Sequence, residues 1–145
     1  MINKNFDDPL TSVELAKKIT KITRNSTTGI VSFTLGALAE MNDAKSQIVI
    51  DEDVEYVLNS IEDEIFHESF IKEKISNQIT EFESVIHSAS MNINPTFVRL
   101  WISAKNDKQT LVQIYIASKE DLSNADKTNS AIEEIKKRFK WTFGD

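Results

Sequence analysis

A dense run of carboxylates between residues 51 and 68 is the feature of this sequence most able to do chemistry. These 18 residues contain eight acids and no lysine or arginine. The acids are Asp51, Glu52, Asp53, Glu55, Glu62, Asp63, Glu64 and Glu68. The segment therefore carries a charge of −8, whereas the other 127 residues, with 17 bases and 15 acids, sum to +2. A concentrated acidic face attracts and orients a basic partner.

The helix dipole offers a second explanation for part of this charge, because it favours acids near a helix N-terminus. Asp53 is a suitable N-cap for a helix that begins at Val54, so the acids at 51–55 fit this explanation. The acids at 62–64 lie too far along that helix. They favour a surface that binds a basic protein, although runs of charge are often only a solvated face.

A metal site at Glu64, His67 and Glu68 is a further candidate. The Glu-x-x-His spacing places both side chains on one face of a helix, as in the carboxylate metal sites of helical bundles. Such bundles need a second Glu-x-x-His motif, and here Glu83 and His87 are four residues apart. Both histidines are more simply interpreted as helix-surface residues, so no metal or other cofactor is expected.

Several other chemistries lack the residues that they require. The chain has no cysteine, which excludes disulfides, zinc–thiolate sites and a cysteine nucleophile. Its three glycines are isolated, so a phosphate-binding loop, a calcium loop and a glycine-flanked serine nucleophile are not expected. We therefore expect a binding protein and not an enzyme.

Basic residues at 136–140 precede Trp141, and cations beside an aromatic ring can bind single-stranded nucleic acid. Basic residues in a last helical turn also complement the helix dipole. Because the chain has a net charge of −6 and a pI near 5.0, no direct nucleic-acid partner is expected. The longest nearly apolar stretch, 29–39, is too short for a membrane span, and no secretory signal pattern is present. These features are typical of a bacterial cytoplasmic protein.

The N-terminal part of the chain predicts a flexible lead-in over 1–10, followed by a single α+β domain over 11–145. Thr11 and Glu14 match a capping box for a helix over about 12–24. The apolar stripe of this helix is Leu15, Ile19 and Ile22.

The middle of the chain predicts mainly helices. Residues 30–43 favour a helix, although alternation at their start leaves a strand open, and 46–50 has a short strand pattern. A helix from Val54 is followed by a second apolar stripe at helical spacing, formed by Ile71, Ile75, Ile79, Phe82 and Ile86. One bent helix over 53–88 and two helices that meet near 66–69 both remain open.

The most clearly patterned segment is a hairpin over 97–117. Residues 97–104 and 110–117 alternate with a period of two and predict strands joined by a five-residue loop. If Ala104 pairs with Thr110, apolar side chains oppose each other on one face, which is then the core side. The pairs are Val98 with Ile116, Leu100 with Ile114, and Ile102 with Val112.

The other face of this hairpin carries Arg99, Trp101 and Tyr115 together with Phe97 and Gln113. Tryptophan, tyrosine and arginine are enriched at the centres of protein interfaces. If the face is exposed, Arg99, Trp101 and Tyr115 are candidate contacts for the partner. Alternatively, a helix or the C-terminal tail of the same chain covers it.

The final segment predicts a helix over about 129–139, and alternation at Phe139, Trp141 and Phe143 also allows a short terminal strand. The expected fold is α+β, with about four to five helices packed on one face of a small antiparallel sheet built around the 97–117 hairpin.

The expected function is that of a small acidic protein-binding module that acts by occlusion. An inhibitor or immunity-type protein for a basic partner such as a nuclease fits best, because an acidic surface can mimic phosphate charge. One alternative is a homo-oligomeric structural or assembly component, including a homodimer, that uses the hairpin face or a 70–90 helix. The other alternative is a metal-dependent enzyme that uses Glu64, His67 and Glu68.

Overall fold

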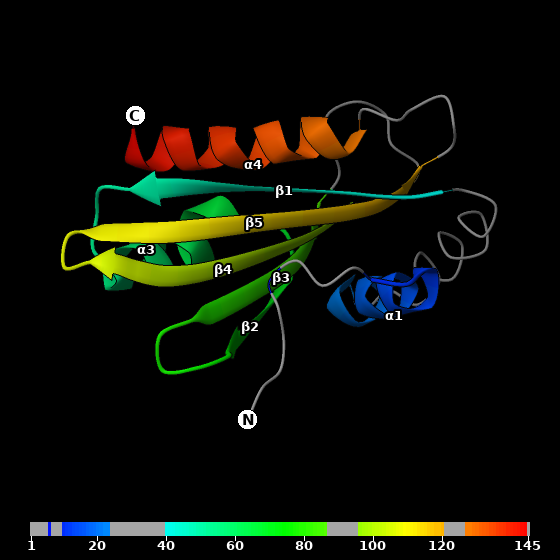
Figure 1. Ribbon diagram of the computed structural model, residues 1–145, viewed down its shortest axis with the longest axis horizontal. Coiled ribbons are helices and arrows are strands. Elements are labelled where there is room, and N and C mark those ends of the chain that lie inside the picture. Colours follow the sequence, from blue (N-terminus) through cyan, green and yellow to red (C-terminus); the bar gives the residue numbers. More distant parts are fainter. Residues whose placement is uncertain (1–5, 7–9, 24–39, 87–95, 121–126, 145) are drawn as a thin grey trace.

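A five-stranded antiparallel sheet forms the centre of the molecule (Figure 1). The computed structural model describes residues 6, 10–23, 40–86, 96–120 and 127–144. Its elements are α1 (Ser12–Thr23), β1 (Glu40–Ile50), α3 (Val54–Ser60), the π-helical turn η1 (Ile61–Ile65), β2 (Phe70–Lys74), β3 (Thr80–Ile86), β4 (Thr96–Asn106), β5 (Gln109–Glu120) and α4 (Lys127–Phe143). The strand order is β1-β5-β4-β3-β2.

The hairpin predicted over 97–117 is formed by β4 and β5 in the predicted register. Ala104 pairs with Thr110, and Val98, Leu100 and Ile102 pair with Ile116, Ile114 and Val112. The strands continue further than expected, so only residues 107 and 108 remain at the turn. Asn106 closes this turn, since its Oδ1 accepts from the backbone N–H of Lys108 at 2.9 Å and its Nδ2 donates to Gln109 at 2.8 Å.

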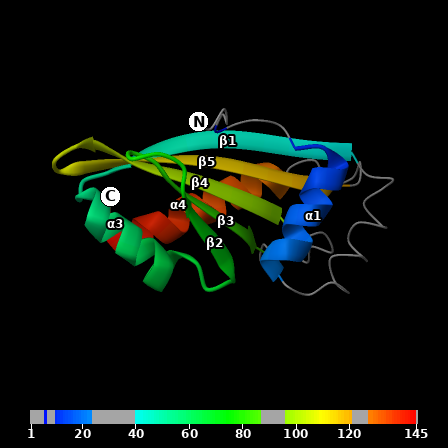
Figure 2. The same cartoon turned by 90° about the horizontal axis from the view of Figure 1, so that it is seen from below.

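Helices pack on both faces of the sheet, which corrects the expectation of a single covered face. Side chains of α3, η1 and α4 form one core cluster with Val98, Leu100 and Ile102. On the other face, Leu15, Ile19 and Ile22 of α1 form a second cluster, together with Val85, Phe97, Tyr115 and Ala117. Because β4 carries large apolar side chains on both sides, both sides must be removed from water. Figures 1 and 2 show α1 and α3 toward opposite ends of the sheet.

The expectation of helix throughout 53–88 is wrong beyond η1. The segment from Phe70 to Ile86 forms β2, a turn and β3. Residues four apart share one face of a strand as well as one face of a helix, so a spacing of four does not separate the two structures. All seven residues of β3 are buried, so Glu81 and Glu83 do not mark a solvent-exposed face as the polar residues of a strand usually do.

The helix predictions near the two ends of the chain are confirmed, and the described part of the one over 30–43 is wrong. The capping box of α1 is confirmed, because Thr11 and Glu14 exchange hydrogen bonds of 3.0 and 3.1 Å. α4 is also confirmed, but it continues to Phe143, so no terminal strand forms there. Residues 40–43 of the segment predicted to be helical belong to β1 instead, and 30–39 lie outside the described residues. The strand predicted at 46–50 is confirmed as the end of β1.

The described helices do not combine the length and hydropathy needed to cross a membrane. The count of α-helices among the described residues is three, which is fewer than the four to five expected.

Candidate functional site

The first acids of the 51–68 segment stabilise the start of α3. Asp53 is the N-cap, and its Oδ1 accepts a hydrogen bond from the backbone N–H of Tyr56 at 2.9 Å. Asp51 accepts from the side-chain amide of Gln109 at 2.7 Å, which joins this loop to the β4–β5 turn. Asp53 therefore has the helix-terminal role expected for this end of the segment, and Asp51 has a structural role of a different kind.

Glu68 forms an ion pair that joins the end of η1 to α4. Arg138 places Nη1 and Nη2 each 2.9 Å from the two carboxylate oxygens of Glu68, and Nη1 also donates to the carbonyl of Ile65. Partial burial raises the pKa of Glu68, but the hydrogen bonds and charge of Arg138 outweigh it and hold that pKa below its ordinary value. The guanidinium of Arg138, which belongs to the basic stretch at 136–140, is therefore bound to other groups of the same chain.

Four acids of the segment are exposed and have no side-chain partner among the described residues: Glu52, Glu55, Asp63 and Glu64. In contrast, Glu62 pairs with Lys72 of β2 at 2.9 Å. Asp63 and Glu64 lie at the C-terminal end of the continuous helical segment α3–η1, where the helix dipole disfavours negative charge. Helical structure with π geometry is rare and is often found at functional sites.

The three proposed contacts on the hairpin do not lie on the surface. Arg99, Trp101 and Tyr115 are 1%, 7% and 2% exposed. α1 packs on this face, and the ring of Phe6 lies 5.9 Å from the ring of Trp101 and 6.4 Å from that of Tyr115. The alternative that a helix of the same chain covers this face is therefore correct, and the exposure that partner contact through these three side chains requires is not found.

A buried network of charges occupies this covered face. The Arg99 guanidinium carbon is 5.5 Å from the ring centroid of Phe97 and 5.4 Å from that of Tyr115. Its Nε is 3.5 Å from Glu81 and 3.3 Å from Glu83, and its Nη1 donates to the carbonyl of Phe6 at 3.1 Å. Both acids are themselves buried. Buried charges of this kind need opposite charges and hydrogen bonds to be tolerated.

Additional contacts complete the network. Trp101 donates from Nε1 to Glu81 at 2.7 Å, and Lys18 of α1 donates to Glu83 at 2.9 Å. Tyr115 donates to Asp43 at 3.0 Å. Burial, followed by this hydrogen bond to a carboxylate, raises the pKa of Tyr115 to about 12. Sequence reasoning missed the roles of Glu81 and Glu83 because it placed them on a helix; alternation of acids with Phe82 and Ser84 was the available signal.

The candidate metal ligands are not brought together. The helical segment ends at Ile65, so His67 lies beyond it and does not share a helical face with Glu64. Glu68 is held by Arg138 instead. Within the described ranges, no group of three histidine or acidic side chains is arranged to hold a metal ion. His87 falls outside these ranges.

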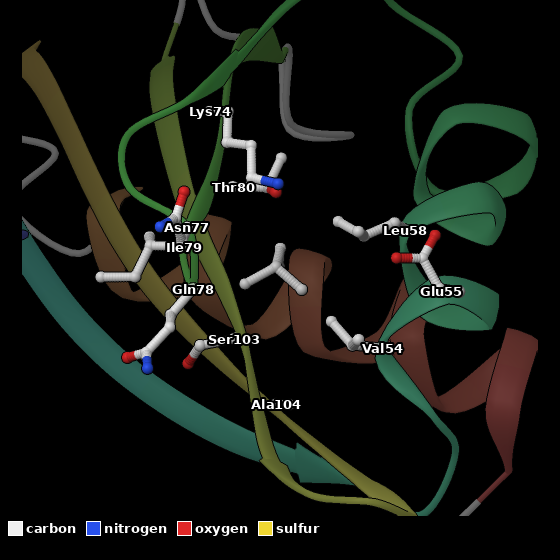
Figure 3. A pocket seen from close by; sticks show the side chains of 11 residues that line it. Val54, Glu55, Leu58, Lys74, Asn77, Gln78, Ile79, Thr80, Ser103 and Ala104 are labelled. Carbon is white, nitrogen blue, oxygen red and sulfur yellow. The ribbon is translucent and has the colours of Figure 1, made fainter.

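A groove of about 460 Å³ separates α3 from the β2–β3 turn and the end of β4 (Figure 3). Val54, Glu55 and Leu58 line it from α3. The β2–β3 hairpin contributes Lys74, Asn77, Gln78, Ile79 and Thr80 to its lining, and β4 contributes Ile102, Ser103 and Ala104. The sequence did not predict this groove, because it treated the β2–β3 turn as part of a helix.

Comparison with known proteins assigns no family to this chain. No family model matches it, and no curated protein matches it significantly. Among solved structures, a START superfamily protein from Mycobacterium smegmatis is 8% identical, with a TM-score of 0.44, and the match covers 70% of this chain and 96% of that one. A structural genomics target from Nitrosospira multiformis is 13% identical, with a TM-score of 0.42 and the same coverage. The Zhui aromatase/cyclase from Streptomyces sp. R1128 is 10% identical, with a TM-score of 0.32, and the match covers 69% of this chain and 87% of that one.

Proposed function

We propose that this chain is a small acidic protein-binding module that occludes a basic surface of its partner, with Asp63 and Glu64 as the principal contacts. One observation carries the proposal. Both carboxylates are exposed, have no partner among the described residues, and lie at the helix end that disfavours negative charge. Residues that break a local stability rule without a compensating contact are expected at functional sites.

The contacts within the fold narrow the acidic surface that a partner can use. Asp51, Asp53 and Glu68 hold the fold together, and Glu62 is paired with Lys72. The proposed contact set is therefore the four acids without partners among the described residues, with Asp63 and Glu64 weighted above Glu52 and Glu55. A partner that normally binds phosphate, such as a nuclease, is a suitable target because its active surface is basic.

The proposal is tested by capture of partners from the native lysate with tagged full-length protein. Asp63→Lys/Glu64→Lys is compared with Asp107→Lys/Glu133→Lys, which makes the same change in net charge at exposed acids of the β4–β5 turn and α4. We expect one basic protein to bind the wild type and the control, to be lost from the first variant, and to be released by high salt. Retention of that protein by Asp63→Lys/Glu64→Lys at moderate salt would show that these acids only promote solubility.

A homo-oligomer is the second candidate, and one observation favours it. β1 is an edge strand that pairs with β5 along its whole length and with no other described strand. Exposed edge strands readily pair with another chain. The two interfaces expected from sequence are not offered by the structure, because α1 covers the hairpin face and 70–86 is not a helix. The mass in solution decides this candidate: a stable symmetric dimer that captures no other protein would favour it.

A further inference from the structure

We infer that the edge of β1 pairs with β1 of a second copy of this chain, antiparallel and about a two-fold axis at Ile48. The pairing joins two five-stranded sheets into one continuous sheet. This inference rests on the second candidate function, the homo-oligomer, and gives it a strand register. It is independent of the acidic contacts at Asp63 and Glu64.

The two edges of the sheet differ in how well they are protected from another chain. Edge strands of natural proteins are usually short, charged or interrupted by a bulge. β2 follows this rule, because it has five residues and ends in the exposed charges of Lys72, Glu73 and Lys74. In contrast, β1 pairs with β5 over 11 residues without a bulge, and it contains no proline. β1 is therefore the edge that can accept another strand.

The last five residues of β1, 46–50, are uncharged. Val49 is 39% exposed and is one of the large apolar side chains that are exposed among the described residues. Ile48 and Ile50 point to the other face, where they pack in the core cluster that includes α4. Because α4 contacts both β1 and β5, it covers a face of the sheet rather than its β1 edge.

Symmetry restricts how two copies of β1 can pair. Residues directly opposite each other in an antiparallel pair place their side chains on the same face of the sheet. Side chains alternate between the faces along a strand, so a residue can oppose only a residue an even number of positions away. The two-fold axis of a symmetric pair must therefore pass through one residue, which opposes itself.

Charge selects Ile48 as the residue on the axis. This register pairs the uncharged stretch 46–50 of one copy with the same stretch of the other. It also places Lys45 opposite Asp51 of the partner subunit, and symmetry repeats this pair at the other end. Asp51 accepts from Gln109 through Oδ1, and a carboxylate has further lone pairs for a lysine.

Neighbouring axes fit less well. An axis at Lys45 would oppose two lysines, which is destabilising. An axis at Ala44 would oppose Lys45 and Asp43, but it would also place Ile48 opposite the charged Glu40. The axis at Ile48 has neither defect.

The paired segment is short, so a moderate affinity is expected. Residues 45–51 of each copy would exchange roughly six to eight backbone hydrogen bonds across the axis. On the face that carries Val49, its side chain would pack against Gln47 of the partner subunit. The buried area lies near the lower limit for a specific interface, and we expect a Kd on the order of 10 μM.

An exchange of charges tests both the surface and the register. Analytical ultracentrifugation of the full-length protein, above and below the expected Kd, should show a monomer–dimer equilibrium. Lys45→Glu should weaken the dimer about tenfold or more, because it opposes two acids at each end of the paired segment. Lys45→Glu/Asp51→Lys should restore dimerisation, since the exchanged charges again attract. Circular dichroism checks that each variant is folded.

The opposite edge of the sheet supplies the matched control. Lys74 is exposed on β2, so Lys74→Glu makes the same change in net charge on the other edge strand. This variant should dimerise as the wild type does.

Disulfide cross-linking checks the register separately, because the chain has no cysteine. In the inferred register, Gln47 lies directly opposite Val49 of the partner subunit. Opposite Cα atoms of antiparallel strands are about 4.5–5.5 Å apart, which a disulfide can span. Mild oxidation of a mixture of the Gln47→Cys and Val49→Cys proteins should therefore yield the mixed dimer in preference to either symmetric one.

A wild type that stays monomeric well above the expected Kd would overturn the inference, as would a dimer that Lys45→Glu leaves intact. Failure of Asp51→Lys to restore the Lys45→Glu dimer would overturn the register at Ile48. These outcomes leave the proposed acidic contacts untouched, because capture of a basic protein by Asp63 and Glu64 is tested by the charge reversal at those two positions.

Discussion

Arg99 is a buried guanidinium whose charge is balanced by Glu81 and Glu83, and this balance makes single substitutions at the covered face costly. β3 and β4 place Glu81 opposite Trp101 and Glu83 opposite Arg99 in the sheet register. The network therefore spans neighbouring strands and also reaches α1 through Lys18. Its residues specify how α1 is placed on the sheet.

Replacement of Arg99 by methionine is expected to lower the free energy of unfolding by about 3–5 kcal/mol, because it removes the cation that balances two buried carboxylates. Denaturation by urea measures the change. Lys108→Met, which removes a cation from the exposed β4–β5 turn, should have little effect. Equal stability of the Arg99→Met variant and the wild type would show that the network contributes nothing to the fold.

The Glu68–Arg138 pair makes stability depend on pH. The pKa of Glu68 is lower in the folded chain than its ordinary value of 4.5, so its contribution is present above pH 4.5 and is lost as pH falls through the folded pKa. Glu68→Gln is expected to lower the free energy of unfolding by about 1–3 kcal/mol at pH 7. The difference from the wild type should shrink below pH 4.5. A difference that stays constant down to pH 2–3 would contradict this assignment.

At the scale of elements, the segment α3–η1 has acids at both ends but contacts for only some of them. The acids near its N-terminus, including the N-cap Asp53, are favoured by the helix dipole. Asp63 and Glu64 are disfavoured by the same dipole, so they are expected to lower stability slightly. Because the dipole acts in opposite senses at the two ends of α3–η1, the effect of neutralising an acid on stability distinguishes a binding role from a structural role.

Neutralising the two acids by Asp63→Asn/Glu64→Gln should raise Tm by roughly 1–4 °C while it weakens capture of the partner. Thermal denaturation followed by circular dichroism provides the measurement. Glu55→Gln, in the first turn of the same helical segment, should shift Tm in the opposite direction. If both changes lower Tm, Asp63 and Glu64 have a structural role and the argument for a binding surface is lost.

At the scale of the whole molecule, the sheet is enclosed by helices on both faces, and its two tryptophans lie in opposite environments. Trp101 is 7% exposed and lies beside the ring of Phe6, whereas Trp141 on α4 is 78% exposed. The Lys137 amine lies 5.1 Å from the ring centroid of Trp141. Once Trp141 is replaced, the fluorescence of Trp101 therefore reports on the covered face of the sheet alone.

In a Trp141→Phe variant, the remaining Trp101 should emit at shorter wavelength than the wild type and should resist quenching by acrylamide. Adding Phe6→Ala is expected to increase the quenching, because the ring of Phe6 lies against Trp101. If Trp101 is quenched as readily as Trp141 in the matching Trp101→Phe protein, the face is accessible in solution. Arg99, Trp101 and Tyr115 would then again be candidate contacts for a partner.

The elements that the sequence determined by itself are those with strong local signals. Apolar residues recur at every second position of β4 and β5, so a shift of one residue would move them to the other face of the sheet. The observed register is the predicted one. The capping box specified α1, and helical periodicity specified α4. The N-cap at Asp53 and the start of α3 at Val54 are also confirmed. These features depend on residues close together in the chain.

Tertiary structure alone decided the rest, because those features depend on distant residues. β3 is buried on both faces because helices cover both sides of the sheet, so its acids Glu81 and Glu83 do not mark a solvent-exposed face. Glu68 and Arg138 are 70 residues apart, and Glu83 and Lys18 are 65 apart, so no local pattern separates paired acids from free ones. The groove likewise exists only where α3 is held beside the β2–β3 turn. The sequence shows where the acids are concentrated, but packing decided which of their carboxylates are paired within the described residues and which are exposed.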